Sequence, residues 1–338
     1  KYSKSLDNAQ KETTLKFSQL QNYLKNEQDA SAYVQSLMEE RKQLQSQLLD
    51  IDMSMLPKMH ESVEVTGRVT AAVAAETGLP EGTVVAGGAG DNAAAAIGTG
   101  TVEDGRCNIS LGTSGTVFIS SEKFGVDPNN ALHAFAHADG GWHLMGCMLS
   151  AASCNKWLLE DIFGTSDHGA EQSAIKEEKL GENHVFFLPY LMGERSPIND
   201  TNARGTFIGM TMDTSRADLV QAVLEGVAYA IRDSVEVARS LGITIDSSKI
   251  CGGGAKSKLW KRIFANVLNA ELECLESEQG PGMGGAMLAM VAGGAYPSVQ
   301  AVCDRFVETA SVVEPEPELV AKYEKRYQQF RKIYPAVK

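Results

Sequence analysis

Short apolar runs that end in glycine-rich turns constrain this chain most strongly. They begin at about Val63, and three of the turns (87–90, 112–115 and 252–254) directly follow a predicted strand. Strands that alternate with helices predict a layered α/β domain. The predicted strands are 83–86 (short and buried), 107–111, 116–120, 142–145, 185–188, 249–251 and 272–275. The predicted helices are 150–163, 216–241, 257–268, 284–292, 298–306 and 318–334; the small residues of 284–292 suit close packing.

The first 50 residues differ in composition from the rest. They contain no glycine and no proline, and apolar residues recur at the spacing of a helix. A polar stretch at 25–29 interrupts the pattern, so a helical hairpin and one long helix both fit. We therefore divide the chain into a helical segment of unknown origin, 1–55, and an α/β domain, 56–338. The segment is either a coiled-coil or hairpin arm for a homodimer or a partner, or a helix packed on its own domain, because periodicity does not separate these cases.

Charge and composition exclude several classes of protein. The net charge of −12 argues against a nucleic-acid partner, which needs clustered lysine and arginine. We expect no membrane contact, because no apolar run is long enough to span a bilayer and no secretory leader is evident. None of the six cysteines falls in a C-x-x-C pair, which predicts reduced thiols in a cytoplasmic protein and no metal site of cysteines. ATP still fits an acidic protein, since a nest of backbone N–H groups can hold phosphate.

Asp91 follows the first glycine-rich turn directly, with Asn92 beside it. Glycines let the backbone approach a ligand closely, and a carboxylate there could accept a proton from a substrate hydroxyl. Asp91 could equally cap the helix predicted over 93–97, a common role for aspartate.

The other two turns have the composition of phosphate and nucleoside sites. The hairpin tip at 112–115 offers backbone N–H groups and the hydroxyls of Thr113 and Ser114, although it could be a plain tight turn. The glycines at 252–254 lie between a strand and a helix, where α/β proteins commonly bind nucleotides; a permissive connection is the simpler interpretation. Residues 280–285 match G-x-G-x-x-G, but the helix predicted downstream disfavours a dinucleotide site, and no P-loop motif occurs.

Taken in order, these sites resemble the C-terminal domain of the FGGY carbohydrate kinases. Residues 205–210, Asp218-Leu219 and 222–225 match the second signature of that family. The stretches 85–92, 148–154, 187–197 and 203–205, with the chain ending 323–338, are most similar to its xylulokinase members. The resemblance runs from near residue 56 to the C-terminus. It implies an actin-like ATPase fold of ribonuclease-H-like domains, here preceded by the α-helical segment.

The resemblance also implies chemistry: transfer of the γ-phosphate of ATP to D-xylulose, giving D-xylulose 5-phosphate, with Mg²⁺ bridging the phosphates. Asp91 resembles the general base and Asn92 a sugar contact. The residues that resemble ATP contacts are Gly112, Thr113, Ser114, Gly253, Gly254, Ala255, Ser257 and Trp157. Glu194 and Arg195 are a family feature that either touches ligand or holds the fold.

The chain departs from the family pattern at its start. No Asp-Gly-Thr occurs before residue 60, so the phosphate loop of the family's first domain and most sugar contacts are not found, and residues 1–55 show no evident relation to the family. We therefore expect slow turnover, or none, from this chain alone, because orientation of both reactants supplies much of the rate. A non-catalytic nucleotide-binding or assembly module, and another FGGY kinase for glycerol or gluconate, stay open as alternatives.

Overall fold

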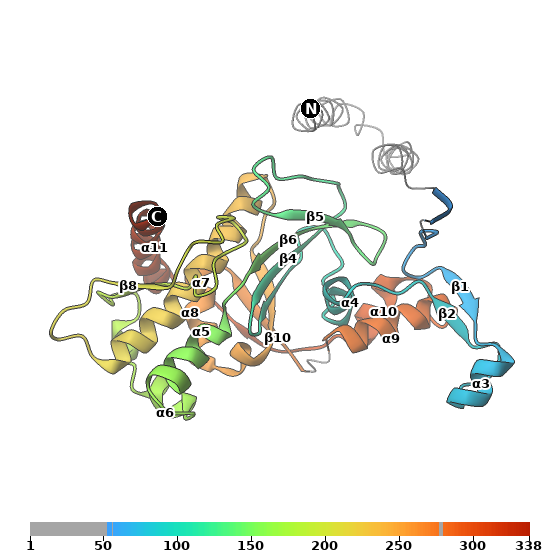
Figure 1. Cartoon of the computed structure of the whole chain (residues 1–338), viewed down its shortest axis with the longest axis horizontal. Coiled ribbons are helices and arrows are strands. Elements are labelled where there is room, and N and C mark those ends of the chain that lie inside the picture. Colours follow the sequence, from blue (N-terminus) through green and yellow to red (C-terminus); the bar gives the residue numbers. More distant parts are fainter. Residues whose placement is uncertain (1–52, 56, 277–279) are drawn as a thin grey trace. The chain divides into compact units, whose positions relative to one another are not determined.

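The computed structural model describes residues 53–55, 57–276 and 280–338 (Figure 1). The chain divides into two compact units, 1–59 and 60–338. In the first unit the described part is short and includes the 3-10 helix η1 (Met53–Met55). The predicted helical arm otherwise lies outside the described residues.

A seven-stranded sheet forms the centre of the second unit, in the order β11-β10-β9-β3-β4-β6-β5. Its strands are β3 (Cys107–Leu111), β4 (Gly115–Ser121), β5 (His133–Ala136), β6 (Trp142–Met148), β9 (Ser247–Cys251), β10 (Glu271–Leu275) and β11 (Thr309–Val313). Strands β3, β9 and β10 are parallel neighbours, whereas the other pairs are antiparallel. The α/β prediction is therefore confirmed. Six of the predicted strands coincide with observed ones; the remaining prediction, 83–86, belongs to one of the smaller sheets.

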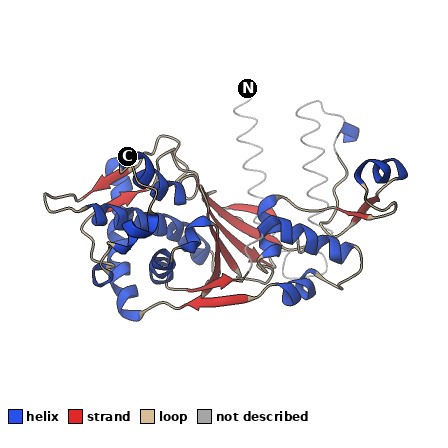
Figure 2. Ribbon diagram, turned by 90° about the horizontal axis from the view of Figure 1, so that it is seen from below, coloured by secondary structure: helices blue, strands red, loops and turns tan. Residues whose placement is uncertain are grey.

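Helices cover both faces of this sheet (Figures 1 and 2). On one face lie α5 (Ala152–Lys156), the π-helical turn η2 (Trp157–Ile162), α7 (Arg216–Ser240), α8 (Lys258–Leu268) and α11 (Pro317–Val337). Alternate residues of β3 and β4, such as Ile109 and Val117, are buried in the same core as these helices, as the period of two along a strand requires. Helix α7 begins with a capping box of Ser215 and Asp218, which fixes its first turn.

The other face carries α4 (Asp91–Gly98), α9 (Gly280–Ala292) and α10 (Val299–Phe306), with a second core around Ile97 and Met287. Helices α4 and α9 approach closely: a Cβ placed on Gly284 would lie 1.7 Å from the carbonyl oxygen of Ala94. The prediction of a close-packed helix is confirmed, but α9 starts at Gly280, four residues before the predicted start. The G-x-G-x-x-G stretch is therefore helical, and Pro281 fits its first turn because no N–H is needed there.

Two smaller sheets flank the large one. Strands β1 (Val65–Arg68) and β2 (Val84–Ala86) pair with each other, joined through α3 (Ala71–Thr77), and β7 (Phe186–Leu188) pairs with β8 (Thr206–Ile208). The expectation that 83–86 is a buried strand is wrong, because β2 has a single partner strand and its residues are exposed or half-buried. The remaining short helices are α6 (His168–Ser173), η3 (Glu177–Lys179) and η4 (Gly253–Lys256). No helix in the described ranges is long and apolar enough to cross a membrane.

Candidate active site

The predicted phosphate loop is the tip of the hairpin between β3 and β4. The last ladder pair joins Leu111 to Gly115, so residues 112–114 form the turn. The side chains of Thr113 and Ser114 are exposed there. The carbonyl oxygens of Gly112 and Thr113 accept bonds of 2.9 Å from the N–H groups of Ala152 and Ala151. The turn is thereby held against the start of α5.

The predicted adenosine segment follows β9 immediately. Gly252 has φ 90°, a conformation that favours glycine, and it directs the chain into η4. Ser257 then caps α8, its hydroxyl oxygen accepting a bond from the N–H of Trp260 at 3.1 Å. Gly253 has open space where a Cβ would stand, whereas a Cβ on Gly254 would lie 2.9 Å from Leu111 and from the Trp260 ring.

The structure brings these two predicted loops together. Strands β3 and β9 are parallel neighbours, with Ser110 opposite Cys251, so both loops leave the same edge of the sheet. A Cβ on Gly252 would lie 2.8 Å from the carbonyl oxygen of Leu111, which shows how closely the backbones pass. The carboxyl edge of parallel strands is where open α/β sheets bind ligands.

Asp91 and Asn92 lie on a different element, the first turn of α4. Gly90 is the N-cap of that helix, so Asp91 is its first residue and the N-cap alternative is wrong. The Asn92 backbone N–H donates to Asp91 Oδ1 at 2.8 Å, and the Asn92 side-chain amide lies 3.3 Å from the same oxygen. These contacts orient the carboxylate, which is exposed. In the described part of the chain, no hydrogen bond joins Asp91 to either loop.

Trp157 is half-buried on η2 and stacks on Phe187, with ring centroids 6.3 Å apart. This contact belongs to the core beneath the helices. The hydrogen bonds among the described residues do not connect Trp157 to the adenosine segment, so its place beside a nucleotide stays a prediction.

Glu194 makes contacts that hold the fold, which is one of the two roles that the sequence left open for Glu194 and Arg195. The residue is buried, and its Oε1 accepts bonds from the N–H groups of Leu149 at 2.8 Å and Arg195 at 2.7 Å. It thus ties the end of β6 to the turn at 194–200, where Glu194 and Asp200 also form a β-bridge. Burial raises the pKa of Glu194 to about 7, against the two N–H bonds and the charge of Arg195.

Glu194→Gln should flatten the pH dependence of stability. Between pH 4.5 and about 7 the folded carboxyl keeps a proton that the unfolded one has lost, so its contribution to stability falls as pH rises through this window. We expect the slope contributed by this residue, in total about 1–3 kcal/mol, to disappear in the variant. Urea unfolding of both proteins across this pH range measures it; equal slopes would contradict the assignment.

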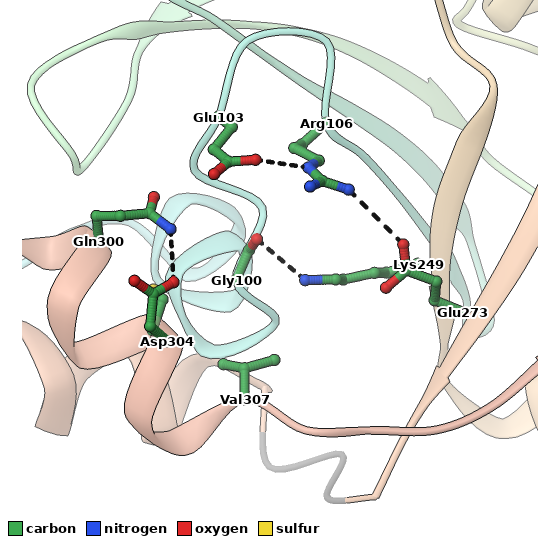
Figure 3. Close-up of a pocket in the computed structure, with 9 residues that line it drawn as sticks. Gly100, Glu103, Arg106, Lys249, Glu273, Gln300, Asp304 and Val307 are labelled. Atoms are coloured by element: carbon green, nitrogen blue, oxygen red, sulfur yellow. Dashed lines mark hydrogen bonds and ion pairs between the residues drawn. The ribbon is translucent and has the colours of Figure 1, made fainter.

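A small pocket of about 150 Å³ lies elsewhere (Figure 3). Its lining includes Lys249, whose ammonium donates to the Gly100 carbonyl at 3.0 Å, and Arg106, which is paired with Glu103 at 2.9 Å. Arg106 directly precedes β3, at the end of the strand opposite the phosphate loop. Lys249 and Arg106 are thus already bonded to groups of the protein itself. None of the predicted site residues lines this pocket.

Comparison with known proteins identifies the family. The model of the FGGY family of carbohydrate kinases, C-terminal domain, matches residues 107–293, which is more than half of the chain. This chain belongs to the FGGY family of carbohydrate kinases. The actin-like ATPase fold expected from the sequence is confirmed with it, because its structural neighbours are sugar kinases of that fold.

A xylulose kinase from Escherichia coli (strain K12) is 38% identical over 290 residues, covering 85% of this chain and 59% of its own length. A crystal structure of a "xyloylose kinase" from Brucella ovis is 40% identical with a TM-score of 0.78, covering 83% of this chain and 58% of its own. A gluconate kinase from Lactobacillus acidophilus has a TM-score of 0.81 and covers 87% of this chain and 60% of its own, but at 24% identity it shows the fold alone. The chain thus spans about three fifths of the length of the relatives it matches.

The model of the N-terminal domain of the same family matches residues 12–98. The expectation that residues 1–55 have no relation to the family therefore does not hold from residue 12 onward. The two family models meet between residues 98 and 107, so the domain boundary at residue 55 and the helical arm stay predictions.

Sequence analysis missed one residue of this region. Gln172, on α6, accepts a hydrogen bond from the Ser257 hydroxyl at 2.5 Å, although 85 residues separate them. No motif marks Gln172, because it is linked to this region by a contact that forms only when the chain folds.

Proposed function

We propose that this chain supplies the nucleotide site and the general base of an ATP-dependent sugar kinase that converts D-xylulose to D-xylulose 5-phosphate. The adjacency of the two glycine-rich loops at the carboxyl ends of β3 and β9 carries the nucleotide part of the proposal. The relatives named xylulose kinase favour D-xylulose over the glycerol or gluconate of other family members. A cytoplasmic location, and self-association through residues 1–55, belong to the same proposal.

The residues divide the chemistry between them. The tip at 112–114 offers backbone N–H groups and two exposed hydroxyls to phosphate oxygens, and the bare backbone at Gly253 offers a flat surface to the nucleoside. Asp91, with Oδ1 held by Asn92, keeps Oδ2 for the proton of the attacking sugar hydroxyl. Phosphoryl transfer depends mostly on positioning and charge stabilisation, which such an arrangement provides.

Mg²⁺ enters the proposal as an ion carried by the phosphates. In the described ranges no group of three or more histidine, cysteine, aspartate or glutamate residues could hold a metal. Mg²⁺ bound to substrate phosphates keeps several waters and needs few protein ligands, so the residues present fit an ion of this kind. When bound, it would neutralise charge on the phosphates.

Asp91→Asn tests the catalytic assignment. We expect sugar phosphorylation to fall by about 10²–10⁴-fold, the usual contribution of a general base, while ATP affinity stays unchanged. Asp213→Asn, at an exposed loop position, serves as the control and should keep the activity of the unchanged protein. Phosphorylation of D-xylulose, glycerol and gluconate is followed by coupled ADP release in a reconstituted two-domain enzyme, and ATP binding by calorimetry on the chain alone.

Three outcomes separate the alternatives. Unchanged phosphorylation by Asp91→Asn would contradict its role as the base. Because this chain alone is expected to turn over sugar slowly or not at all, ATP binding without turnover of any sugar would favour a nucleotide-binding module only if it persists in a reconstituted two-domain enzyme. Turnover of glycerol or gluconate in preference to D-xylulose would favour another FGGY kinase.

Gly253→Ala tests the nucleotide site. The added Cβ meets no protein atom within 4 Å, so the thermal unfolding midpoint should not fall. We expect ATP to bind about tenfold more weakly, which corresponds to a loss of 1.4 kcal/mol, because the methyl group would stand where the nucleoside lies. Gly282→Ala, which also meets no atom within 4 Å, is the matched control. Equal ATP affinity of the two variants would remove Gly253 from the site.

A further inference from the structure

Gln172 fixes the direction of the Ser257 hydroxyl. Ser257 Oγ donates its proton to Gln172 Oε1 at 2.5 Å and accepts a bond from the Trp260 N–H at 3.1 Å. A serine hydroxyl has one proton and two lone pairs. With the proton and one lone pair engaged, the hydroxyl has one lone pair left for a ligand. It can therefore accept a hydrogen bond from a ligand but cannot donate one.

The position of Gln172 does not depend on the adenosine segment. Its neighbour Glu171 receives two-pronged bonds from Arg216 at the start of α7, at 2.6 Å and 2.9 Å. The Arg216 guanidinium also lies over the Phe163 ring, 4.0 Å from its centroid. Asp167 caps α6 by accepting from the Ala170 N–H at 2.9 Å. Helix α6 is thus held by α7 and by its own cap, and it presents Gln172 to Ser257.

An acceptor at Ser257 discriminates between nucleotides. Adenine carries an amino donor at position 6, where guanine carries a carbonyl acceptor, and the ribose hydroxyls are also donors. A Ser257 hydroxyl that can only accept pairs with a donor such as the adenine amino group or a ribose hydroxyl. It would leave the carbonyl acceptor of guanine unpaired. One unpaired group of this kind costs about a factor of five to ten in affinity.

We infer that Gln172 is a positioning residue for nucleotide selection, which holds the Ser257 hydroxyl as an acceptor for a donor group of the nucleoside. The inference rests on the proposed function, because it assumes that the adenosine segment binds ATP. It goes further in naming a residue on α6, outside both glycine-rich loops, and the kind of nucleotide group that the site selects.

The test compares, in the full chain, the dissociation constants of different nucleotides as ratios to that of ATP. Dissociation constants for ATP, GTP and 2′-deoxyATP, each with Mg²⁺, are measured by calorimetry for the unchanged protein and for Gln172→Ala, Gln172→Glu and Ser173→Ala. Gln172→Glu keeps an acceptor for the Ser257 proton, and any repulsion between its charge and the phosphates affects all three nucleotides alike. Ser173→Ala, on the same helix, removes a hydroxyl that donates to Gly169, and serves as the control.

We expect Gln172→Ala to lower about fivefold either the ratio of the GTP to the ATP dissociation constant or the ratio of the 2′-deoxyATP to the ATP dissociation constant. The reason is that the Ser257 hydroxyl, once freed, can rotate and donate. A change in the GTP-to-ATP ratio places the contact at the base, and a change in the 2′-deoxyATP-to-ATP ratio places it at the ribose. Gln172→Glu and Ser173→Ala should keep both ratios. Unchanged ratios in Gln172→Ala, with the thermal midpoint of the unchanged protein, would overturn the inference alone. No binding of any nucleotide by the unchanged protein would instead overturn the proposed function.

Discussion

Gly284→Ala is expected to lower the free energy of unfolding by about 3 kcal/mol, the upper range for overpacking a close contact. A Cβ on Gly284 would lie 1.7 Å from the Ala94 carbonyl oxygen and 3.0 Å from the Gly98 amide nitrogen. Both atoms are backbone of α4, so no side-chain rotation relieves the clash. Gly98 is equally restricted, since its Cβ would lie 2.2 Å from the Gly280 carbonyl oxygen. The two helices must therefore separate.

Gly285→Ala provides the matched control for this prediction. The next residue of the same helix has no atom within 4 Å of an added Cβ. Alanine there should stabilise the protein by up to about 1 kcal/mol, because glycine is a poor helix former. Urea unfolding of both variants measures the difference. Equal stabilities of the two variants would show that the packing of α4 on α9 does not require glycine at position 284.

Since α4 begins with Asp91, Gly284→Ala should also reduce phosphorylation more than ATP binding.

Glu225→Ala is expected to cost about 3–5 kcal/mol, because it leaves a buried arginine without its counter-charge. Glu225 is 1% exposed, and its Oε1 accepts bonds from Gln221 at 2.7 Å and Tyr323 at 3.1 Å. Arg326 Nε lies 3.8 Å from Glu225 Oε2. Burial raises the pKa of Glu225, and Arg326 is the main group that opposes this shift. The carboxylate thus joins α7 to α11 through a buried network.

A second variant separates loss of charge from loss of packing. Glu225→Leu combined with Arg326→Met removes both charges and keeps apolar volume, so it should recover much of the lost stability. Glu182→Ala breaks an exposed pair with Lys322 and should leave the unfolding midpoint unchanged. Chemical denaturation followed by circular dichroism compares the three proteins. A double variant no more stable than Glu225→Ala would indicate that the hydrogen bonds of Glu225, rather than its charge, hold α7 to α11.

Local features were readable from the sequence because their physics is local. The short apolar runs at 107–111 and 116–120 predicted β3 and β4, and the glycine-bearing turn between them predicted the tip. The helix at 284–292 was predicted to pack closely from its small residues, and α4 does approach Gly284. The strand at 83–86 was predicted correctly, but its burial was not. A short apolar run before a glycine-rich turn indicates a strand, whereas its burial depends on what the fold places over it.

The sequence by itself determined the α/β class, the two glycine-rich loops and the family, since strand period, glycine conformations and signature residues all lie within short stretches of chain. The tertiary structure decided which residues meet. It placed the loops after 111 and 251 side by side through the parallel pairing of β3 with β9, and it gave Glu194 a fold-holding role. It also paired Gln172 with Ser257 and Glu225 with Arg326. Such contacts join distant parts of the chain, and only the packing of α6, α7 and α11 on the sheet brings them within reach.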